Sequence, residues 1–483
     1  MIPYSRCLLT AVTFAFLGGC MVGPDHQTPD PILSKQWHAS GTSAQPLRAA
    51  DKATLMSWWK TFDDPLLTRL IEEARQQNPD LKMAYERITQ ARSEQNANRA
   101  DLYPRVSATG VAARASNMLP IQTPNGNAFD YFLTGFDAVW EIDLFGRLRR
   151  RLEAAEAQTT ASVEEYRQAF LILAAETARQ YVQYREMQEA HRITETILGL
   201  LQEKESLIRL RVNTGLSTHD ELDRIGALAM TTRAESTRQT AELVSGRHRL
   251  ELLLGRQPDT LQTTLGAPGT VPASNERRLL TQPASILRYR PDIRGAEQKL
   301  AGATAMQGAA LAEMFPKISV VAFLGLHNSD LENLFRSSAF AWASAASISQ
   351  PLFNFGKIRA GIKLADAQQR EAAFNYEKTV LSALHECESA LSDTLKEEQR
   401  KQELQQSLAH LQTASHLAEH RFQGGLGTRQ AEIDAILETQ GAELGLLQSR
   451  AALSTRLIAL YKALGGGGLA PVEIEEDPLR PWG

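Results

Sequence analysis

Residues of types that can do hydrolytic or metal chemistry occur in this chain, but their spacing is incomplete for each known pattern. His385 and Glu386 lack the second histidine, four residues after the first, that a zinc-dependent hydrolase helix requires. Ser57 begins a Ser-x-x-Lys spacing, which is short enough to occur by chance in many chains. His416 and His420 are one helical turn apart and could share a metal, although a solvated pair on a helix is the favoured interpretation. Glycine patterns that bind nucleotide phosphates do not occur, and we expect no enzyme activity, no cofactor and no metal site.

Cys20 is the residue whose surroundings predict covalent chemistry. Met1–Arg6 carries one positive charge, and Cys7–Leu17 is an apolar run of eleven residues, too short to span a bilayer as a finished helix. Gly18 and Gly19 then precede Cys20. This arrangement resembles the bacterial lipobox, in which the cysteine sulfur receives a diacylglycerol and the amine exposed by cleavage is acylated. Several acyl chains would anchor the chain stably, since each buried CH₂ contributes about 0.8 kcal/mol. The alternative is an ordinary signal peptide with a chance cysteine.

The overall composition restricts the class of protein. The 483 residues are 43% apolar and 22% charged, which is typical of a folded chain. The 52 basic and 56 acidic side chains leave a net charge of -4, so nucleic acid is not an expected partner. Mean hydropathy is -0.29 and the long apolar run is confined to the N-terminus, which excludes a multi-helix membrane transporter. Three cysteines are too few for a disulfide scaffold, and we expect Cys387 to be a small buried residue.

The chain contains one pattern twice. Asn78-Pro79-Asp80-Leu81 recurs 212 positions later as Arg290-Pro291-Asp292-Ile293. Further along, the offset becomes 210 and stays constant. The segments related by this second offset are Phe145-Gly146-Arg147 with Phe355-Gly356-Lys357, Thr214–Thr218 with Gly424–Thr428, and Leu254-Gly255 with Leu464-Gly465. A register held over most of the chain predicts a tandem structural repeat.

Each copy is predicted to contain three helices and two strands. Apolar residues in steps of three and four form a narrow seam along the longest helix, which is typical of coiled-coil packing. That helix would be roughly 100 Å long at 1.5 Å per residue. We expect the two shorter helices to stack end to end beside it. The predicted helices are 79–103, 146–214 and 218–254 in the first copy, and 291–315, 356–424 and 428–464 in the second.

The strands lie between the first and second helix of each copy. Residues 130–145 alternate between apolar and polar side chains, and 106–114 do so more weakly; 318–326 and 340–348 are the counterparts. One interpretation is a soluble sheet with one face on a core, but the thin helical seams offer little core. The other is a membrane sheet. Four strands cannot close a barrel alone, and an open edge is not tolerated in lipid, so a membrane sheet requires a homo-oligomer.

These features together resemble the outer membrane factor family of the TolC/OprM/NodT type. The resemblance covers essentially the whole mature chain, and its motifs are specific in their order and spacing. They are Cys20–Asp25 with Pro29; Trp58-Trp59 with Phe62, Asp64-Pro65 and Leu66; Asn78–Leu81; Leu102-Tyr103-Pro104; the twofold repeat; and Gly425 followed nine residues later by Asp434-Ala435. Met21, rather than aspartate, follows Cys20, which by resemblance to lipoprotein sorting favours the outer membrane.

The resemblance implies an α+β membrane protein whose repeat supplies four transmembrane β-strands and long antiparallel periplasmic helices. A trimer would close a twelve-stranded β-barrel on an α-helical barrel. The corresponding divisions are 1–19, a signal peptide; 20–77, a lipidated N-terminal segment and equatorial belt; 78–255, the first repeat; 256–289, an equatorial linker; 290–464, the second repeat; and 465–483, a C-terminal equatorial tail.

The implied function is that of an exit duct in a tripartite efflux system, which passes small molecules such as drugs or toxic compounds to the exterior. The implied partners are two further copies of the chain, a periplasmic adaptor (membrane fusion) protein, an inner membrane pump and outer membrane lipid. A type I protein secretion duct is the alternative within this class. A lipid-anchored coiled-coil spacer without a pore is the alternative outside it, but it does not account for strands placed identically in both copies.

The family also implies positions for a periplasmic gate. Asp434 matches an acidic family position near the second helix turn, where side chains from three subunits form a ring. A second acidic position of some relatives is Ala431 here, and Glu432 is the candidate substitute. Asp220 and Asp223 occupy the comparable turns of the first repeat. Carboxylates that converge on an axis would repel one another and attract cations. A solvated helix face is the alternative for Asp434.

Two further sets of residues are predicted to make contacts. The helix turns are candidates for adaptor contact, and they are Gly215, Leu216, Ser217, Thr218, Gly425, Leu426, Gly427 and Thr428. Aromatic residues in the strands are candidates for the membrane interface, and they are Tyr131, Phe132, Trp140, Phe340 and Trp342. Trp58 and Trp59 are expected to be packing anchors instead of a ligand site.

Overall fold

The computed structural model describes residues 21–29, 37, 48–49, 52–115, 129–274, 279–280 and 289–468. The predictions for the signal peptide, Cys20 and the tail after residue 468 lie outside the described residues. Two units each combine segments of both sequence repeats. Unit 1 comprises Met1–Asp30, Arg87–Ser162 and Gly295–Glu377, and unit 2 comprises Pro31–Glu86, Val163–Arg294 and Lys378–Gly483.

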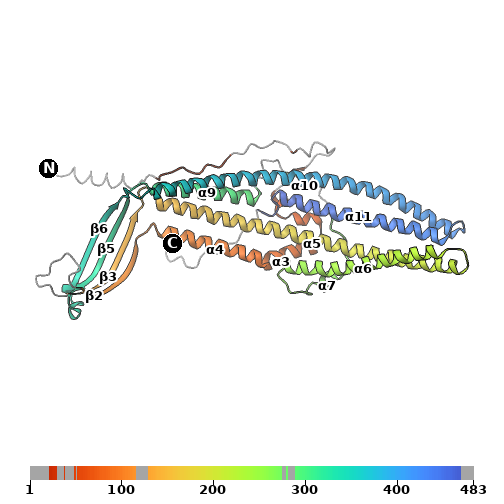
Figure 1. Ribbon diagram of the computed structural model, residues 1–483, viewed down its shortest axis with the longest axis horizontal. Coiled ribbons are helices and arrows are strands. Elements are labelled where there is room, and N and C mark those ends of the chain that lie inside the picture. The colour runs from red at the N-terminus through yellow and green to blue at the C-terminus, as the bar shows by residue number, and fades with distance from the viewer. Residues whose placement is uncertain are drawn as a thin grey trace. The chain divides into compact units, whose positions relative to one another are not determined.

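Unit 1 contains an antiparallel sheet in the order β2-β3-β5-β6 (Figure 1). The strands are β2 (Arg105–Ala115), β3 (Phe129–Ile142), β5 (Lys317–Asn328) and β6 (Phe340–Ser349), which confirms all four predicted strands. The hairpin of each repeat joins the other through β3 and β5, where Phe136 lies opposite Leu324. Within the described chain, β2 and β6 each have one neighbour and therefore one open edge.

The helices occur in pairs of equal length, one from each repeat. They are α4 (Pro79–Ala100) and α9 (Pro291–Ala312), 22 residues each; α5 (Arg147–Asn213) and α10 (Lys357–Gln423), 67 each; and α6 (His219–Leu253) and α11 (Arg429–Ala463), 35 each. The predicted tandem repeat is confirmed. Among the described residues, no helix is both long and apolar enough to cross a bilayer.

The first helix of each repeat is shorter than predicted. α4 ends at Ala100 instead of Tyr103, and α9 ends at Ala312 instead of Phe315. The N–H of Tyr103 donates to the carbonyl of Ala100 at 3.0 Å, so the last turn is tightened. The cause is the proline that follows, because it disfavours helical geometry in the residue before it.

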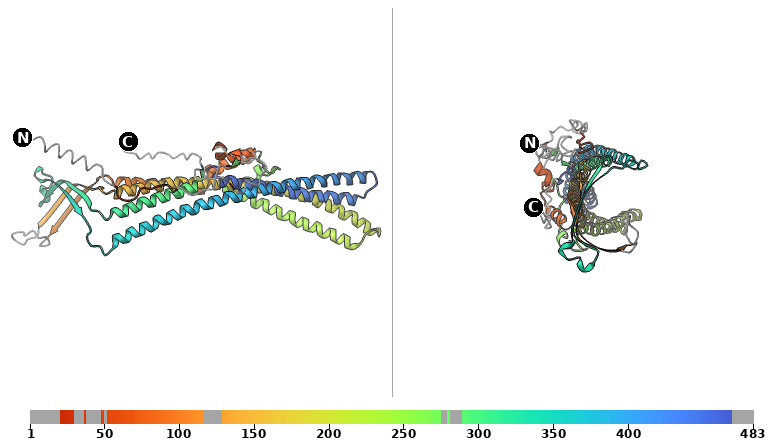
Figure 2. Two further views of the ribbon diagram at one scale, coloured as in Figure 1. Left: turned by 90° about the horizontal axis from the view of Figure 1, so that it is seen from above. Right: turned by 90° about the vertical axis from the view of Figure 1, so that its left-hand side faces the viewer.

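In unit 2, each long helix turns back into a shorter one, and the two helices of each hairpin lie side by side in the views of Figures 1 and 2. Gly215 has φ 74° and Gly425 has φ 72°. The N–H of Leu216 donates to Arg211 O at 2.7 Å, and that of Leu426 to Arg421 O at 2.8 Å, as in a Schellman turn. Positive φ at this position is typical of a glycine that ends a helix.

The shorter helices meet end to end, as predicted. In the first repeat, Asn78 Nδ2 donates to Leu253 O, at the end of α6, at 2.9 Å. In the second, Arg290 Nη1 donates to Ala463 O, at the end of α11, at 2.9 Å. Each side chain precedes the next helix and satisfies a carbonyl that the preceding helix leaves unpaired.

Shorter elements complete unit 2. They are β1 (Arg48–Ala49) and β4 (Leu279–Leu280), which pair in parallel, α2 (Lys52–Met56), the 3₁₀ helix η2 (Trp58–Phe62), α3 (Pro65–Gln77) and α7 (Gln262–Leu265). Unit 1 has two more 3₁₀ turns, Leu331–Asn333 and Ser337–Ala339. Trp58 is fully buried and stacks on Tyr461 at 5.5 Å, while Trp59 meets Phe170 edge-on at 6.1 Å. The packing role predicted for both tryptophans is confirmed, as is the burial of Cys387.

Candidate functional site

The two hairpin turns expose apolar side chains at matching positions. Leu216 is 70% exposed and Leu426 is 85% exposed. Thr218 and Thr428 cap the returning helices, because their hydroxyls accept from the N–H groups of Glu221 and Ala431. The predicted contact residues therefore lie in the same type of turn in both repeats, and each turn exposes a leucine.

Just beyond the turns, an ion-pair network joins the first hairpin to the second. Asp434 on α11 bonds to Lys204 Nζ on α5. Arg429 Nε lies 2.7 Å from Glu203 Oε1, and Arg429 Nη1 lies 2.8 Å from Glu432 Oε2. All of these side chains belong to unit 2. They join α5 of the first repeat to α11 of the second.

An amide extends this network toward the first turn. Gln430 Oε1 accepts from Arg211 Nη1 at 2.6 Å, and Gln430 Nε2 donates to Glu221 Oε1 at 3.0 Å. Glu221 also accepts from the hydroxyl of Ser217. Both turns are thus connected through one side chain of α11.

The charges of the network stabilise one another. The hydrogen bond from Arg429 lowers the pKa of Glu203, and the hydrogen bonds from Ser217 and Gln430 lower the pKa of Glu221. Hydrogen bonds to Glu203 and Glu432 in turn raise the pKa of Arg429. Glu432 is buried, so its carboxylate depends on Arg429 for a counter-charge.

The four predicted gate residues therefore fall into two groups. Asp434 and Glu432 lie in the network. Asp220 bonds instead to Arg224 on its own helix at 3.0 Å, and Asp223 is exposed. Sequence reasoning missed Lys204, Glu203 and Arg429, because residues more than 220 positions apart carry no local signal of their pairing.

Four of the predicted interface aromatics lie at two levels of the sheet, whereas Trp342, which pairs with Leu324 opposite Phe136, lies midway between them. Phe132 lies opposite Asn328 and Phe340 opposite Leu326, near the loop end of the strands. Trp140 lies eight positions after Phe132 in β3, and its Nε1 donates to Leu102 O at 3.0 Å. Tyr131 is adjacent to Phe132 and contacts His327, and Trp342 is 71% exposed.

One face of the sheet carries a row of exposed apolar side chains. Phe136, Leu324 and Trp342 are paired in register across β3, β5 and β6, so their side chains point to the same side. They are 60%, 52% and 71% exposed. Apolar surface of this extent is typical of a face that contacts lipid or another protein.

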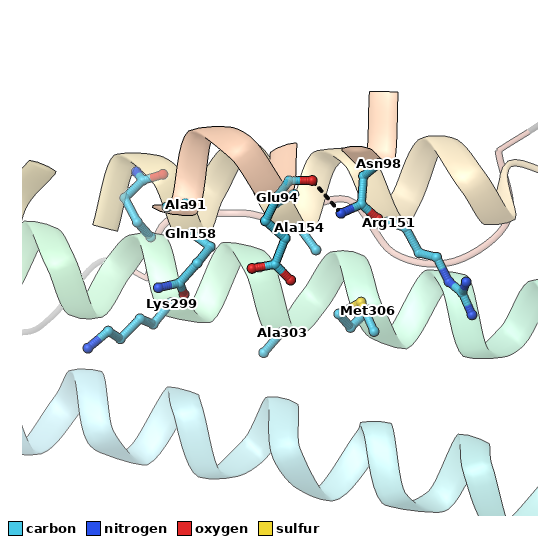
Figure 3. A pocket seen from close by; sticks show the side chains of 12 residues that line it. Ala91, Glu94, Asn98, Arg151, Ala154, Gln158, Lys299, Ala303 and Met306 are labelled. Atoms are coloured by element: carbon cyan, nitrogen blue, oxygen red, sulfur yellow. Dashed lines mark hydrogen bonds between the residues drawn. The ribbon is translucent and has the colours of Figure 1, made fainter. Parts of the chain in front are cut away.

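A groove of ≈ 440 Å³ lies among α4, α5 and α9 in unit 1 (Figure 3). Alanines form much of its lining, and Asn98 Nδ2 donates across one helical turn to Glu94 O at 2.8 Å. In Figure 3, Arg151 and Lys299 point toward opposite ends of the groove instead of converging. We therefore assign no ligand to it.

Comparison with known proteins identifies the family that has this architecture. The family model described as outer membrane efflux protein matches residues 70–256 and 283–466. The toluene efflux pump outer membrane protein TtgC of Pseudomonas putida is 31% identical over 466 residues, 95% of each chain. The cation efflux system protein CusC of Escherichia coli is 29% identical over 97% of this chain and 99% of its own. The solved outer-membrane channel OprN is 32% identical and superposes with a TM-score of 0.85 over 93% of this chain and 100% of its own. Since the match covers both repeats, the chain belongs to the outer membrane efflux protein family.

Proposed function

We propose that three copies of this chain form the exit duct of a tripartite efflux pump, a water-filled path for small molecules through the outer membrane. The observation that carries the proposal is the likeness of the whole chain to outer membrane efflux proteins such as TtgC and CusC. An inner membrane pump would supply energy, and a periplasmic adaptor would connect it to the duct. Cys20 is proposed to carry the acyl anchor.

The open sheet edges support the trimer. Unpaired backbone groups cost several kcal/mol each in lipid, so β2 and β6 need partner strands there. Pairing β6 of one copy with β2 of the next removes every edge. Four strands from each of three copies give a closed sheet of twelve.

The aromatic residues support a membrane position for that sheet. Phe132 and Trp140 are eight residues apart on one strand, which corresponds to roughly 26 Å at about 3.3 Å per residue. That separation matches the apolar band of about 25 Å between the aromatic girdles of membrane strands. The exposed row formed by Phe136, Leu324 and Trp342 lies between these levels.

The hairpin turns are proposed to bind the adaptor, and the network behind them to hold the duct closed. Leu216 and Leu426 offer apolar contacts at both turns. Opening would move the hairpins apart and break the bonds of Asp434 and Arg429 to α5. A partner that binds the separated hairpins more tightly would shift the population toward the open duct.

The test is single-channel conductance of the detergent-extracted, full-length protein in a planar bilayer. Wild type is compared with Asp434→Ala and with Asp223→Ala, whose carboxylate is exposed outside the network. We expect cation-selective pores whose open probability rises several-fold in Asp434→Ala and stays unchanged in Asp223→Ala.

The other outcomes separate the parts of the proposal. Pores whose open probability is the same in Asp434→Ala as in wild type would support the duct and contradict the proposed role of Asp434 in the gate. Folded trimers that stay silent in every variant would overturn the duct and favour the lipid-anchored spacer. Export of polypeptides but not of dyes in cells would favour the protein secretion duct.

A further inference from the structure

The segment that directly follows Cys20 is held against unit 1 by a buried arginine. The side chain of Arg150, in the first turn of α5, is 2% exposed. Its Nε donates to Val22 O at 3.3 Å and its Nη2 to Gly23 O at 3.2 Å. A buried charge costs several kcal/mol unless it is paired and hydrogen-bonded. The N-terminal segment therefore supplies hydrogen-bond acceptors to this buried guanidinium.

Two carboxylates complete the surroundings of Arg150. Asp25 Oδ1 lies 2.8 Å from Nη2, and Glu153 Oε2 lies 2.8 Å from Nη1. Despite burial, their hydrogen bonds and charges raise the pKa of Arg150. One of these carboxylates belongs to α5 and the other to the N-terminal segment, so the arginine links the two.

Glycines allow the segment to lie directly on α9. A Cβ on Gly23, whose φ is +100°, would lie 2.5 Å from Gly308 Cα. A Cβ on Gly308 would lie 2.9 Å from Arg150 Nε and 3.0 Å from Val22 O. Only glycine permits this approach of two backbones.

The same segment is attached to the end of β3. The N–H of Val22 donates to Phe145 O at 3.2 Å. A Cβ on Gly146 would lie 2.9 Å from Met21 Cγ and 3.0 Å from Met21 Cα. Phe145 and Gly146 lie in the turn between β3 and α5, so Met21 lies just beyond the end of a proposed membrane strand.

We propose that Arg150, Gly23 and Gly308 form a seat that fixes the acylated end of the chain at the foot of β3. The inference rests on the proposed acylation of Cys20, which is one residue before Met21. A lipid tethered this closely keeps the strands at a high effective concentration at the membrane surface, and a longer free tether lowers it. Arg150 is thus a positioning residue for the anchor.

The main test compares two glycines of α9. Gly308→Ala removes the space for Val22 and Arg150. Gly302→Ala is the matched control, because a Cβ there would lie 3.5 Å from Ala154 O, an ordinary contact. Both changes favour the helix by about 1 kcal/mol, so a difference between them reports the seat.

The readout is hydrogen exchange of the peptide covering residues 21–29 in the full-length protein in detergent. We expect the Val22 amide to exchange at least tenfold faster in Gly308→Ala and at the wild-type rate in Gly302→Ala. Peptides from the middle of α5 should remain protected in both. Equal exchange of residues 21–29 in the two variants would overturn the seat.

A second pair of variants tests the arginine itself. Arg150→Met removes the donors to Val22 and Gly23. Arg151→Met changes the next residue, which lines the groove of Figure 3 instead. Loosening of residues 21–29 in Arg150→Met alone is expected, and loosening in neither would contradict the role of Arg150. Should Arg150→Met fail to fold, the glycine pair decides.

Two measurements separate this inference from the proposed anchor. The mass of the N-terminal peptide shows whether Cys20 is acylated, independently of the seat. In cells, Gly308→Ala should lower the yield of heat-resistant outer membrane trimer several-fold relative to Gly302→Ala. Acylated protein with equal yields would overturn the positioning role and leave the anchor. Protein without acyl groups would overturn the anchor, and with it this role of the seat, while conductance still tests the duct.

Discussion

The two helix hairpins, whose turns lie in unit 2, have the same backbone geometry and differ in what their side chains contact. Each has a long helix of 67 residues and a returning helix of 35. Each turns at a glycine with φ near +73° and starts again at a threonine cap. The first turn of α6, however, bonds mainly within its own hairpin, through Asp220 and Arg224. The first turn of α11 reaches across to α5 through Arg429.

This difference shows that the two repeats keep the same turn geometry while their side chains make different contacts. The shared turn is a property of the backbone, and both copies keep it because glycine and threonine satisfy the same unpaired groups. The link between hairpins needs partners on a helix of the other repeat. The returning helix α11 supplies the charged part of that link through Arg429 and Asp434, and α6 contributes the bond between Glu221 and Gln430. Four predictions test this comparison, from the largest expected effect to the smallest.

The two turns should respond alike when their glycines are replaced. Gly215→Val and Gly425→Val should each destabilise their turn by about 2 kcal/mol, because a β-branched residue is strained at positive φ. A Cβ at either position has no atom within 4 Å, so no clash adds to the strain. Hydrogen exchange of the turn amides should rise roughly thirtyfold in both. A large effect at one turn alone would contradict the shared geometry.

Arginines at the start of the returning helices should respond differently. Arg429→Met should weaken the link between hairpins by about 1.5 kcal/mol, since it leaves the buried Glu432 without its counter-charge. Arg224→Met is the control in the first hairpin, where the exposed pair with Asp220 contributes under about 0.5 kcal/mol. Hydrogen exchange of the first two turns of α11, measured beside those of α6, checks both values. Equal effects would show that the two hairpins are held in the same way.

Exchanging the charges of one pair sharpens the assignment. Lys204→Asp and Asp434→Lys each place like charges together and should raise the open probability of the pore. The double variant restores opposite charges and should return the open probability close to wild type. For a partly exposed pair we expect a coupling of about 0.5–1 kcal/mol, measured as a double-mutant cycle. Additive effects of the two single changes would show that the pair does not hold the gate.

Lowering the pH should produce the smallest change in pore opening. The pKa values of Glu203 and Glu221 are lowered in the folded protein, so their contribution is present above the unfolded pKa near 4.3 and is lost as pH falls through the folded value. Pore opening should therefore be constant between about pH 5 and 8 and rise slightly below about pH 4. Glu203→Gln should flatten this rise. A change centred near pH 6 would point to histidine instead.

Most of the fold could be predicted from sequence because its signals are local. Helices α5 and α10 begin and end within one residue of the prediction, since Gly146, Gly215, Gly356 and Gly425 stop or start them by their own conformation. The errors at the ends of α4 and α9 came from the turn before proline, where the final three residues bond more tightly. The period of two predicted the strands, and the repeat predicted that both copies contain the same elements.

The candidate site was predictable only in part. Asp434 and Glu432 were found by resemblance, and the exposed leucines by their place in the turns. Lys204, Glu203 and Arg429 were not found, because charged residues on long solvated helices look alike until a partner is known. The seat of Arg150 was missed for the same reason, since Gly23 and Gly308 are ordinary glycines in the sequence and meet only in the folded chain.

By itself, the sequence determined the elements of this protein, their lengths and their twofold repetition, because periodicity, glycines, prolines and caps act within a few residues. The tertiary structure alone decided which charges meet: Asp434 with Lys204, Arg429 with Glu203, and Arg150 with the segment after Cys20. The physical reason is the separation along the chain between the residues that interact. Backbone conformation follows from neighbours along the chain, whereas an ion pair or a buried arginine depends on residues that more than a hundred positions of chain must first bring together.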